Sequence, residues 1–261
     1  MTWDSFAMVD WSGGNDTGPT PTRDAIWIGW VIAGEEREPV YMRNRTEALG
    51  WLAGLIVAER NAGRRLLIGF DFPFGYPSGF GRHLTGSDDP LAVWAWLRRN
   101  LRDQPEGNNR FELAGRINRG LPGVGPFWFN GTQDDVEGLP RKGTEREGHG
   151  QRERREVEEL ARGTFSCWQM GGAGAVGGQA MTGMAAVWKL VEQMRDDVSV
   201  WPFEPLNRAA GLVEIWPSLL ADAVRAEGDA IKDRAQVRVM ARALAGLSAA
   251  DLRDMLDVHG P

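Results

Sequence analysis

Two aspartates stand near the ends of apolar segments, a placement that could support metal-assisted chemistry. Asp10 lies in SFAMVDWS and precedes a polar turn, and Asp71 lies in LIGFDFPFGYP. The prolines and glycine after Asp71 cannot continue a central strand, so the chain should turn there. A carboxylate in a buried strand costs free energy unless a partner compensates its charge. We therefore expect both acids at the carboxyl edge of a sheet, where open α/β sheets bind ligands.

Two further acids could join this pair. Glu214 lies in the apolar segment LVEIWPS, and Asp233 lies at the N-terminal end of the expected helix IKDRAQVRVMARAL. If the strands of Asp10 and Asp71 are neighbours, their carboxylates repel and raise each other's pKa, and a divalent cation is the natural compensation. Two cations about 3.5–4 Å apart, held by such carboxylates, would form a site for phosphodiester hydrolysis.

Each acid also has a simpler explanation. A buried aspartate can cap a turn or pair with an arginine. Glu204 in WPFEP could take the place of Glu214, and the helix dipole alone favours an acid in a first helical turn, where Asp233 is expected.

The residue types restrict which metal could bind. Cys167 is the only cysteine and the three histidines are scattered, which excludes a His/Cys zinc site and an internal disulfide. Carboxylate oxygens would have to hold any metal, and such ligands favour Mg²⁺ or Mn²⁺ as the cofactor.

The bulk composition is that of an ordinary globular protein. The 261 residues are 42% hydrophobic and 25% charged, with a net charge of −6. A negative net charge argues against a broad nucleic-acid-coating surface but permits a local basic groove. The N-terminal MTWDSFAMVD is not a signal peptide and no run has the length of a membrane span. The sequence predicts a cytoplasmic protein with no membrane contact.

The order of apolar segments predicts an α/β fold. An antiparallel meander, a helix and a fourth strand come first, and strands and three terminal helices come last. The expected strands cover 5–12, 25–34, 39–44, 64–72, 166–170, 198–204 and 212–217. The expected helices cover 46–61, 90–103, 109–118, 179–194, 217–228, 233–247 and 248–258. We predict one domain, 1–261, built on a mixed five-stranded sheet with helices on both faces and an insertion at about 78–165.

These elements resemble the ribonuclease H-like superfamily. More narrowly, the motif Asp-x-Pro-x-Gly-x-Pro, which begins at Asp71, and Glu-x-x-Pro, which begins at Glu214, are similar to an uncharacterised bacterial branch described as predicted nucleases. The resemblance covers the chain except for the insertion. It implies a ribonuclease H-like sheet and metal ligands at Asp10, Asp71, Glu214 and Asp233. Many members have another acid one turn along the last helix, where this chain has Gln236 and Val237, which weakens the case for a second metal.

Two glycine-rich segments suggest other functions. Ser12, Gly13 and Gly14 resemble the first phosphate loop of the actin and sugar-kinase group, which implies an ATP-dependent phosphotransferase. The segment GGAGAVGG matches G-x-G-x-x-G, but the acid required for a dinucleotide site, Glu192, falls inside an expected helix. Amides of GGAGAVGG, at the start of that helix, could instead bind a substrate phosphate.

The insertion could contact nucleic acid. Residues 98–119 contain six arginines and three acids, and nearby aromatic side chains could stack on bases. These aromatic residues are Trp94, Trp96, Phe127 and Trp128. The alternative is that the tryptophans pack the helix onto the domain and the arginines are solvated.

The leading prediction is a metal-dependent nuclease or phosphodiesterase that acts on nucleic acid or a small phosphoester. The alternatives are the phosphotransferase and a non-catalytic protein that binds a nucleotide or a partner. We expect Cys167 to be a small buried residue rather than a nucleophile.

Overall fold

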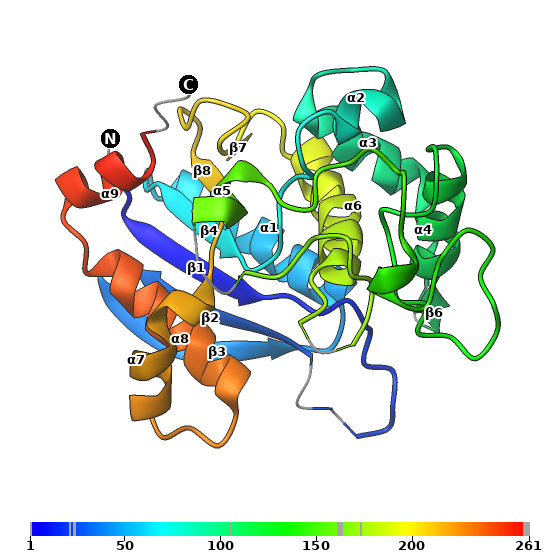
Figure 1. Cartoon of the computed structure of the whole chain (residues 1–261). Coiled ribbons are helices and arrows are strands. Elements are labelled where there is room, and N and C mark those ends of the chain that lie inside the picture. Colours follow the sequence, from blue (N-terminus) through cyan, green and yellow to red (C-terminus); the bar gives the residue numbers. More distant parts are fainter. Residues whose placement is uncertain are drawn as a thin grey trace. The chain divides into compact units, whose positions relative to one another are not determined.

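The computed structural model describes residues 2–20, 22, 25–104, 106–160, 164–172 and 174–257. Among these residues the main sheet has six strands in the order β3-β2-β1-β4-β8-β7 (Figure 1). The strands are β1 (Ser5–Asp10), β2 (Ile26–Ile32), β3 (Glu35–Met42), β4 (Leu66–Phe70), β7 (Val198–Val200) and β8 (Ala210–Glu214).

The sheet is mixed, as the sequence predicted. Strands β1, β2 and β3 form the antiparallel meander, whereas β4 pairs in parallel with both β1 and β8. The predicted number of five strands is wrong, because β7 adds a sixth. This strand has only three residues, all buried, and it pairs in parallel with β8.

The chain divides into two compact units. Unit 1 comprises Met1–Asp71 and Leu190–Pro261, and unit 2 comprises Phe72–Lys189. Unit 1 contains the sheet with α1 (Arg45–Asn61), η2 (Pro217–Leu220), α7 (Ala221–Ala226), α8 (Lys232–Ala245) and α9 (Ala249–Met255). The predicted helix 248–258 thus ends early, and its residue 258 lies outside the described residues. Unit 2 extends beyond the predicted insertion on both sides.

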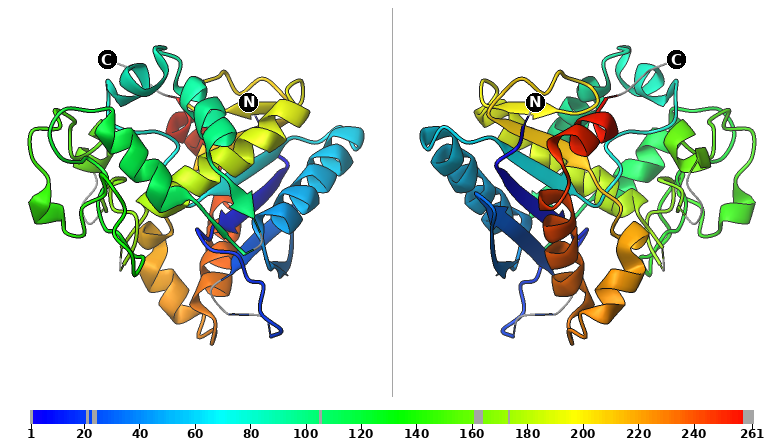
Figure 2. Two further views of the ribbon diagram at one scale, coloured as in Figure 1. Left: turned by 90° about the vertical axis from the view of Figure 1, so that its right-hand side faces the viewer. Right: turned by 90° about the vertical axis from the view of Figure 1, so that its left-hand side faces the viewer.

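Helices α1 and α8 cover opposite faces of the sheet (Figure 2). Helix α1 begins after Asn44, whose side chain accepts a hydrogen bond from the Glu47 amide, and Trp51 of α1 meets Trp30 of β2 edge to face. Residue 29 of β2 points to the other face because side chains alternate along a strand. The sequence prediction of helices on both faces is confirmed for unit 1.

A glycine sets how closely α8 approaches the sheet. A Cβ atom at Gly29 would lie 2.2 Å from the carbonyl oxygen of Val237 in α8. The helix then buries an apolar stripe against β1 and β4, where Phe6, Met8 and Leu67 belong to one core cluster with residues of α8. The N-terminal end of α8 is held over the same face of the sheet.

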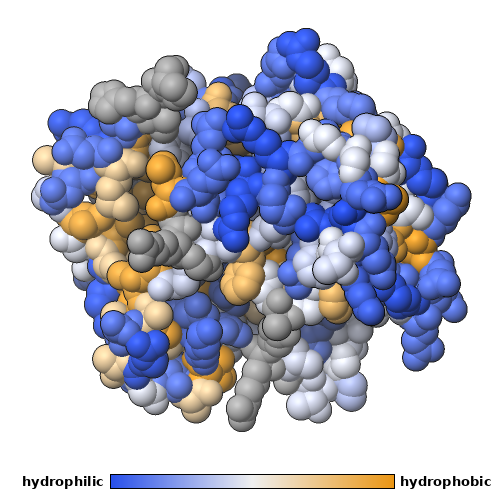
Figure 3. Space-filling model, viewed as in Figure 1, coloured by the Kyte–Doolittle hydropathy of each residue, from blue (hydrophilic) through white to orange (hydrophobic). Residues whose placement is uncertain are grey.

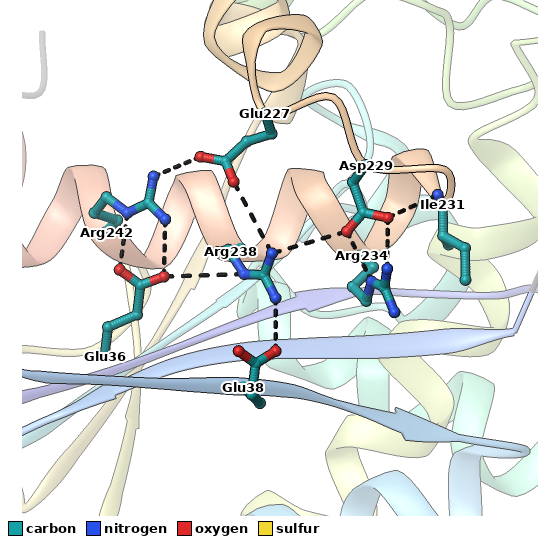
Figure 4. A network of polar contacts seen from close by, with 8 residues as sticks. All are labelled: Glu36, Glu38, Glu227, Asp229, Ile231, Arg234, Arg238 and Arg242. Carbon is teal, nitrogen blue, oxygen red and sulfur yellow. Dashed lines mark hydrogen bonds and ion pairs between the residues drawn. The ribbon is translucent and has the colours of Figure 1, made fainter.

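An ionic network also holds α8 in place (Figure 4). Three arginines of α8 face acids of β3 and of the turn after α7. The members are Arg234, Arg238, Arg242, Glu36, Glu38, Glu227 and Asp229. The bidentate contact of Arg234 lowers the pKa of Asp229 to about 2. Because single surface ion pairs contribute about 0–1 kcal/mol, the network matters more for the position of α8 than for stability.

The regular elements of unit 2 are mainly helices, joined by long irregular segments. It contains α2 (Phe80–Thr85), α3 (Pro90–Asn100), α4 (Arg110–Arg119), η1 (Gly143–Glu145), α5 (Glu156–Leu160) and most of α6 (Gly177–Gln193), with a small hairpin of β5 (Asp103–Gln104) and β6 (Gly107–Asn108). The predicted strand 166–170 is wrong. Within this segment only Gln169 forms a β-bridge, an isolated one with Trp128. The segment is held instead by the packing of its side chains. Trp168 stacks on Tyr76 and meets Phe127 in the core of this unit.

The surface of unit 1 exposes hydrophobic side chains around its C-terminal helices. Leu219, Leu247 and Met255 are exposed, and Figure 3 shows hydrophobic colour gathered on the left, the side of α8 and α9. Within the described parts of the chain, no helix combines the length and apolarity needed to cross a lipid bilayer.

The contact at Gly29 provides a test of the packing. We expect Gly29→Ala to destabilise the protein by about 1–3 kcal/mol, because its methyl group would overlap the α8 backbone. Gly54→Ala in α1 is the matched control, since a Cβ there meets nothing within 4 Å and should stabilise the helix by up to about 1 kcal/mol. Urea unfolding measures both, and equal stability of the two variants would contradict the packing argument.

Candidate active site

Three acids lie at the carboxyl ends of three neighbouring strands. Asp10 ends β1, Asp71 follows β4 directly, and Glu214 ends β8. The strands are in register here, because the Asp71 amide donates to the carbonyl of Val9 and the Ile215 amide donates to the carbonyl of Phe70. The expectation that Asp10 and Asp71 meet at one sheet edge is confirmed.

Asp10 and Asp71 form a hydrogen-bonded pair of side chains. The Asp71 Oδ1 atom also accepts a hydrogen bond of 2.7 Å from the backbone amide of Trp11. The pKa of Asp71 is raised to about 6: desolvation is the largest cause and the Asp233 carboxylate adds to it, while the hydrogen bonds from Asp10 and Trp11 oppose the increase. A hydrogen bond between two carboxyl groups requires a proton, so the pair holds one proton over the range in which ordinary aspartates are ionised.

Asp233 completes a group of three acids on one face of the sheet. It lies in the first turn of α8, the helix whose close approach depends on Gly29. Its charge acts on Asp71. Each of the three aspartate residues is partly exposed. The charge of Asp233 thus reaches the Asp10–Asp71 pair, whereas its role as a metal ligand stays a prediction.

Glu214 lies at the same sheet edge but belongs to the opposite face. Its neighbour Ile215 packs with Met8 beside Gly69, on the side of α8. Alternation along β8 therefore directs Glu214 away from that side, and its Oε1 atom accepts a hydrogen bond of 2.7 Å from the Trp216 indole. The position of Glu214 at the end of β8 thus sets it at the same sheet edge as Asp10 and Asp71, while the alternation of side chains sets it on the other face.

The turn after Asp10 is anchored by a residue that sequence reasoning missed. The buried Arg45, at the start of α1, donates to the carbonyl oxygens of Ser12 and Gly14 at 2.9 and 2.6 Å. The Gly14 amide donates to the Ser12 hydroxyl. The expected phosphate loop at Ser12, Gly13 and Gly14 thus has its Gly14 amide already engaged. In the sequence, the position of Arg45 directly after the helix cap Asn44 is the feature that could have drawn attention to this residue.

A second anchor holds the rest of this loop. The Asp16 carboxylate accepts hydrogen bonds from the Arg43 guanidinium, the Tyr41 hydroxyl and the Thr22 amide. The Arg43 contact, followed by that of Tyr41, lowers the pKa of Asp16 well below its usual range. Asp16 is therefore a structural acid, and sequence reasoning missed it because its two side-chain partners, Tyr41 and Arg43, lie 25 and 27 residues away.

The remaining candidates lie outside the carboxylate group. The Glu204 side chain accepts from the Val200 amide and pairs with Arg208, so it holds a turn. Glu192 lies in α6, as expected, which disfavours a dinucleotide site. Burial raises the pKa of the Cys167 thiol well above its usual value, in keeping with its prediction as a buried residue.

The ligand set suits a hard divalent cation. In the described part of the chain, no group of three or more His, Cys, Asp or Glu side chains is already arranged as a metal site. Asp10 and Asp71 form a pair to which Asp233 adds like charge. Carboxylate oxygens are the ligand type that Mg²⁺ and Mn²⁺ prefer, and they bind such ions in the deprotonated form.

Comparison of the chain with protein-family models, with curated proteins and with solved structures found no match. The function must therefore be argued from the site itself.

The raised pKa of Asp71 predicts a pH-dependent stability. The folded-state pKa of about 6 lies above the value of 3.8 for the unfolded chain. Ionisation of Asp71 therefore lowers the stability of the folded state. This cost is complete above about pH 6 and absent below about pH 3.8. Without metal, Asp71→Asn should stabilise the protein at pH 7–8 by at most about 3 kcal/mol, an upper limit because Asp71 is partly exposed. The gain should vanish near pH 4.

Asp16→Asn is the matched control for this measurement. Its pKa is lowered rather than raised, so losing the charge should destabilise the protein at neutral pH. Urea unfolding in EDTA across pH 4–8 measures both variants. A destabilising effect of Asp71→Asn at pH 8 would contradict the proposed electrostatics.

Proposed function

We propose that the protein is a divalent-metal-dependent phosphodiesterase that uses Asp10, Asp71 and Asp233 to hold its cation. The observation that carries this proposal is the hydrogen-bonded pair of Asp10 and Asp71, with Asp233 adding like charge to it. Such an arrangement costs stability at neutral pH. A bound Mg²⁺ or Mn²⁺ ion would reverse this cost.

The simpler explanation, an ion pair with an arginine, does not account for Asp71. Within the described residues, Asp71 makes no ion pair with an arginine or lysine side chain. Its partners are another carboxyl group and a backbone amide. By contrast, Asp16 and Asp229 each have an arginine partner and a lowered pKa. The difference supports a functional role for Asp71.

The three aspartates have distinct tasks in this proposal. A bound cation would supply a water molecule with a lowered pKa and positive charge to stabilise the leaving oxygen. Asp10 and Asp71 bind the ion from the rigid sheet edge, and the Trp11 amide keeps the Asp71 carboxylate oriented. Asp233 binds it from α8. Three carboxylates with water ligands suffice for one cation.

The arrangement of strands supports the same proposal. The resemblance to the ribonuclease H-like superfamily implies an antiparallel meander followed by parallel strands, with acids at the ends of the first and fourth strands. The order β3-β2-β1-β4-β8 is in keeping with that expectation. The phosphotransferase is less well supported, because the Gly14 amide is engaged with Ser12 rather than directed to a ligand.

The test is cleavage of labelled single- and double-stranded DNA and RNA, and of a small aryl phosphodiester, in Mn²⁺. We expect Asp10→Asn, Asp71→Asn and Asp233→Asn each to lose at least about 10- to 100-fold in rate. Glu214→Gln should retain more activity than any of them, because its side chain belongs to the other face. Glu204→Gln is the matched control outside the site. Absence of cleavage of all substrates, or full activity of Asp71→Asn, would overturn the proposal.

Metal binding gives an independent measurement. Mn²⁺ should raise the Tm of the wild type, because a ligand that binds only the folded state stabilises it. The shift should be absent in Asp71→Asn and unchanged in Glu204→Gln. An equal shift in all three proteins would place the cation elsewhere.

A further inference from the structure

Unit 1 contains a pocket that the carboxylate site does not use. We call it the tryptophan pocket, and its volume is about 490 Å³, within the range of about 300–1,000 Å³ that is typical of small-molecule sites. Its lining comes from three segments of unit 1: the chain before β1, the turn after β7 and the end of α9. The main lining residues are Trp3, Trp201, Phe203, Leu206, Arg253 and Leu256.

The tryptophan pocket is distinct from the carboxylate group. Trp3 precedes β1 and Leu206 precedes β8, so both lie toward the amino ends of these strands. Asp10 and Glu214 lie at the opposite, carboxyl ends. Among the described residues, no acid of the carboxylate group lines the pocket. The pocket is therefore a second candidate site.

The wall of the pocket is aromatic. Trp3, Trp201 and Phe203 line it, and each of them is partly exposed. Leu206 and Leu256 add aliphatic surface. Large apolar side chains that meet around a hollow and stay partly exposed are typical of a binding site. The pocket therefore favours a ligand with an apolar body.

Internal contacts hold this wall in place. The Arg65 guanidinium lies over the Trp3 ring, 4.0 Å from its centroid, and donates a hydrogen bond of 2.7 Å to the Leu206 carbonyl. The Trp201 indole donates a hydrogen bond of 3.0 Å to the Leu256 carbonyl. The three segments are thus tied together by contacts of the chain itself. A pocket that is ordered in advance loses less conformational entropy when a ligand binds.

Among the described residues, three charged side chains line the pocket, and two of them are already engaged. Glu204 accepts a hydrogen bond from the Val200 amide and pairs with Arg208, and Asp257 also has a partner. The Arg253 side chain makes no hydrogen bond or ion pair with a described residue. The helix dipole favours an arginine in the last turn of α9 but does not explain the aromatic wall beside it. The pocket is therefore complementary to an anion.

We propose that the tryptophan pocket binds a small aromatic carboxylate. The ring of the ligand packs against Trp3, Trp201 and Phe203, and its carboxylate accepts hydrogen bonds from the Arg253 guanidinium. Aromatic rings attract one another through edge-to-face and offset contacts, beyond the gain from buried area. The planar fork of a guanidinium matches the two oxygens of a carboxylate. This site goes beyond the proposed hydrolysis and does not depend on it.

The first test uses 2-naphthoate as the probe. Isothermal titration calorimetry of the wild type in EDTA compares it with the uncharged 2-naphthamide and the cationic 2-naphthylmethylammonium. We expect saturable binding of the carboxylate, about 10-fold weaker binding of the amide, and the weakest binding of the cation. Absence of saturable binding of 2-naphthoate, or tighter binding of the cation, would overturn the proposal.

Arg253→Gln tests the charged contact. It should weaken the binding of 2-naphthoate by about 10-fold and leave the binding of 2-naphthamide unchanged, because only the carboxylate needs the guanidinium. Arg225→Gln is the matched control, since Arg225 lies in the last turn of α7 and does not line the pocket. Equal weakening by both variants would show that overall charge, rather than the pocket, attracts the probe.

Phe203→Leu tests the aromatic contact. It should weaken the binding of 2-naphthoate and of 2-naphthamide alike, by about 2- to 10-fold. Phe165→Leu, at an exposed aromatic residue of unit 2, is the control and should bind both probes as the wild type does. Unchanged binding by Phe203→Leu would contradict the aromatic assignment.

Decanoate tests the same point without a variant, and it decides the question if circular dichroism shows that Phe203→Leu is unfolded. This aliphatic carboxylate should bind the wild type more weakly than 2-naphthoate does. Equal or tighter binding of decanoate would mean that the pocket does not select aromatic rings.

The two proposals fail separately. If the wild type cleaves a substrate but does not bind 2-naphthoate, the tryptophan pocket is wrong as a ligand site and the carboxylate site stands. If the wild type binds 2-naphthoate through Arg253 but cleaves nothing, the proposed reaction is wrong and the tryptophan pocket stands.

Discussion

The parallel pairing of β1 with β4 creates the central constraint of this protein. Their shared register brings Asp10 and Asp71 into hydrogen-bonding contact at the carboxyl end of the sheet. Two carboxyl groups in a partly desolvated site cannot both ionise without cost. The pair therefore retains a proton or, in the proposed function, takes a cation.

Helix α8 makes this constraint stronger. It brings a third carboxylate, that of Asp233, to the pair through a close contact that only a glycine at position 29 allows. Its arginines meanwhile engage acids of β3 and of the turn after α7 (Figure 4). In the first turn of the helix Arg234 pairs with Asp229, while the adjacent Asp233 adds its charge to the Asp10–Asp71 pair.

The polar side chains around the loop after Asp10 have two different roles. Arg45 and Asp16 have partners that satisfy their charges, and they make the loop after Asp10 rigid. Rigid support of this kind keeps a metal-coordinating side chain in position when a metal ion binds. Asp71, which follows β4, has the Asp10 side chain and the Trp11 amide as partners instead of an arginine. The loop is therefore held by charged and polar partners, whereas the acid pair carries an electrostatic cost.

The pattern of apolar residues and turn formers was enough to predict much of unit 1. Hydrophobic runs are local signals, so the meander, the end of β4 at Asp71 and the helical nature of α1 and α8 could be recognised from short segments. The prediction was less successful where structure depends on distant partners. The expected strand at 198–204 is present only as Val198–Val200, the part that pairs with β8, and segment 166–170 packs against aromatic residues of unit 2 instead of forming a strand.

The sequence by itself determined which acids stand at strand ends, because a carboxylate between an apolar run and a turn is visible in the chain. Only the tertiary structure decided which of them meet. Glu214 shares the edge with Asp10 and Asp71 but belongs to the other face, since one residue of strand parity reverses a side chain. Asp233 joins the pair from more than 160 residues beyond Asp71 because Gly29 admits α8, and no local pattern records a contact between two backbones so far apart in sequence.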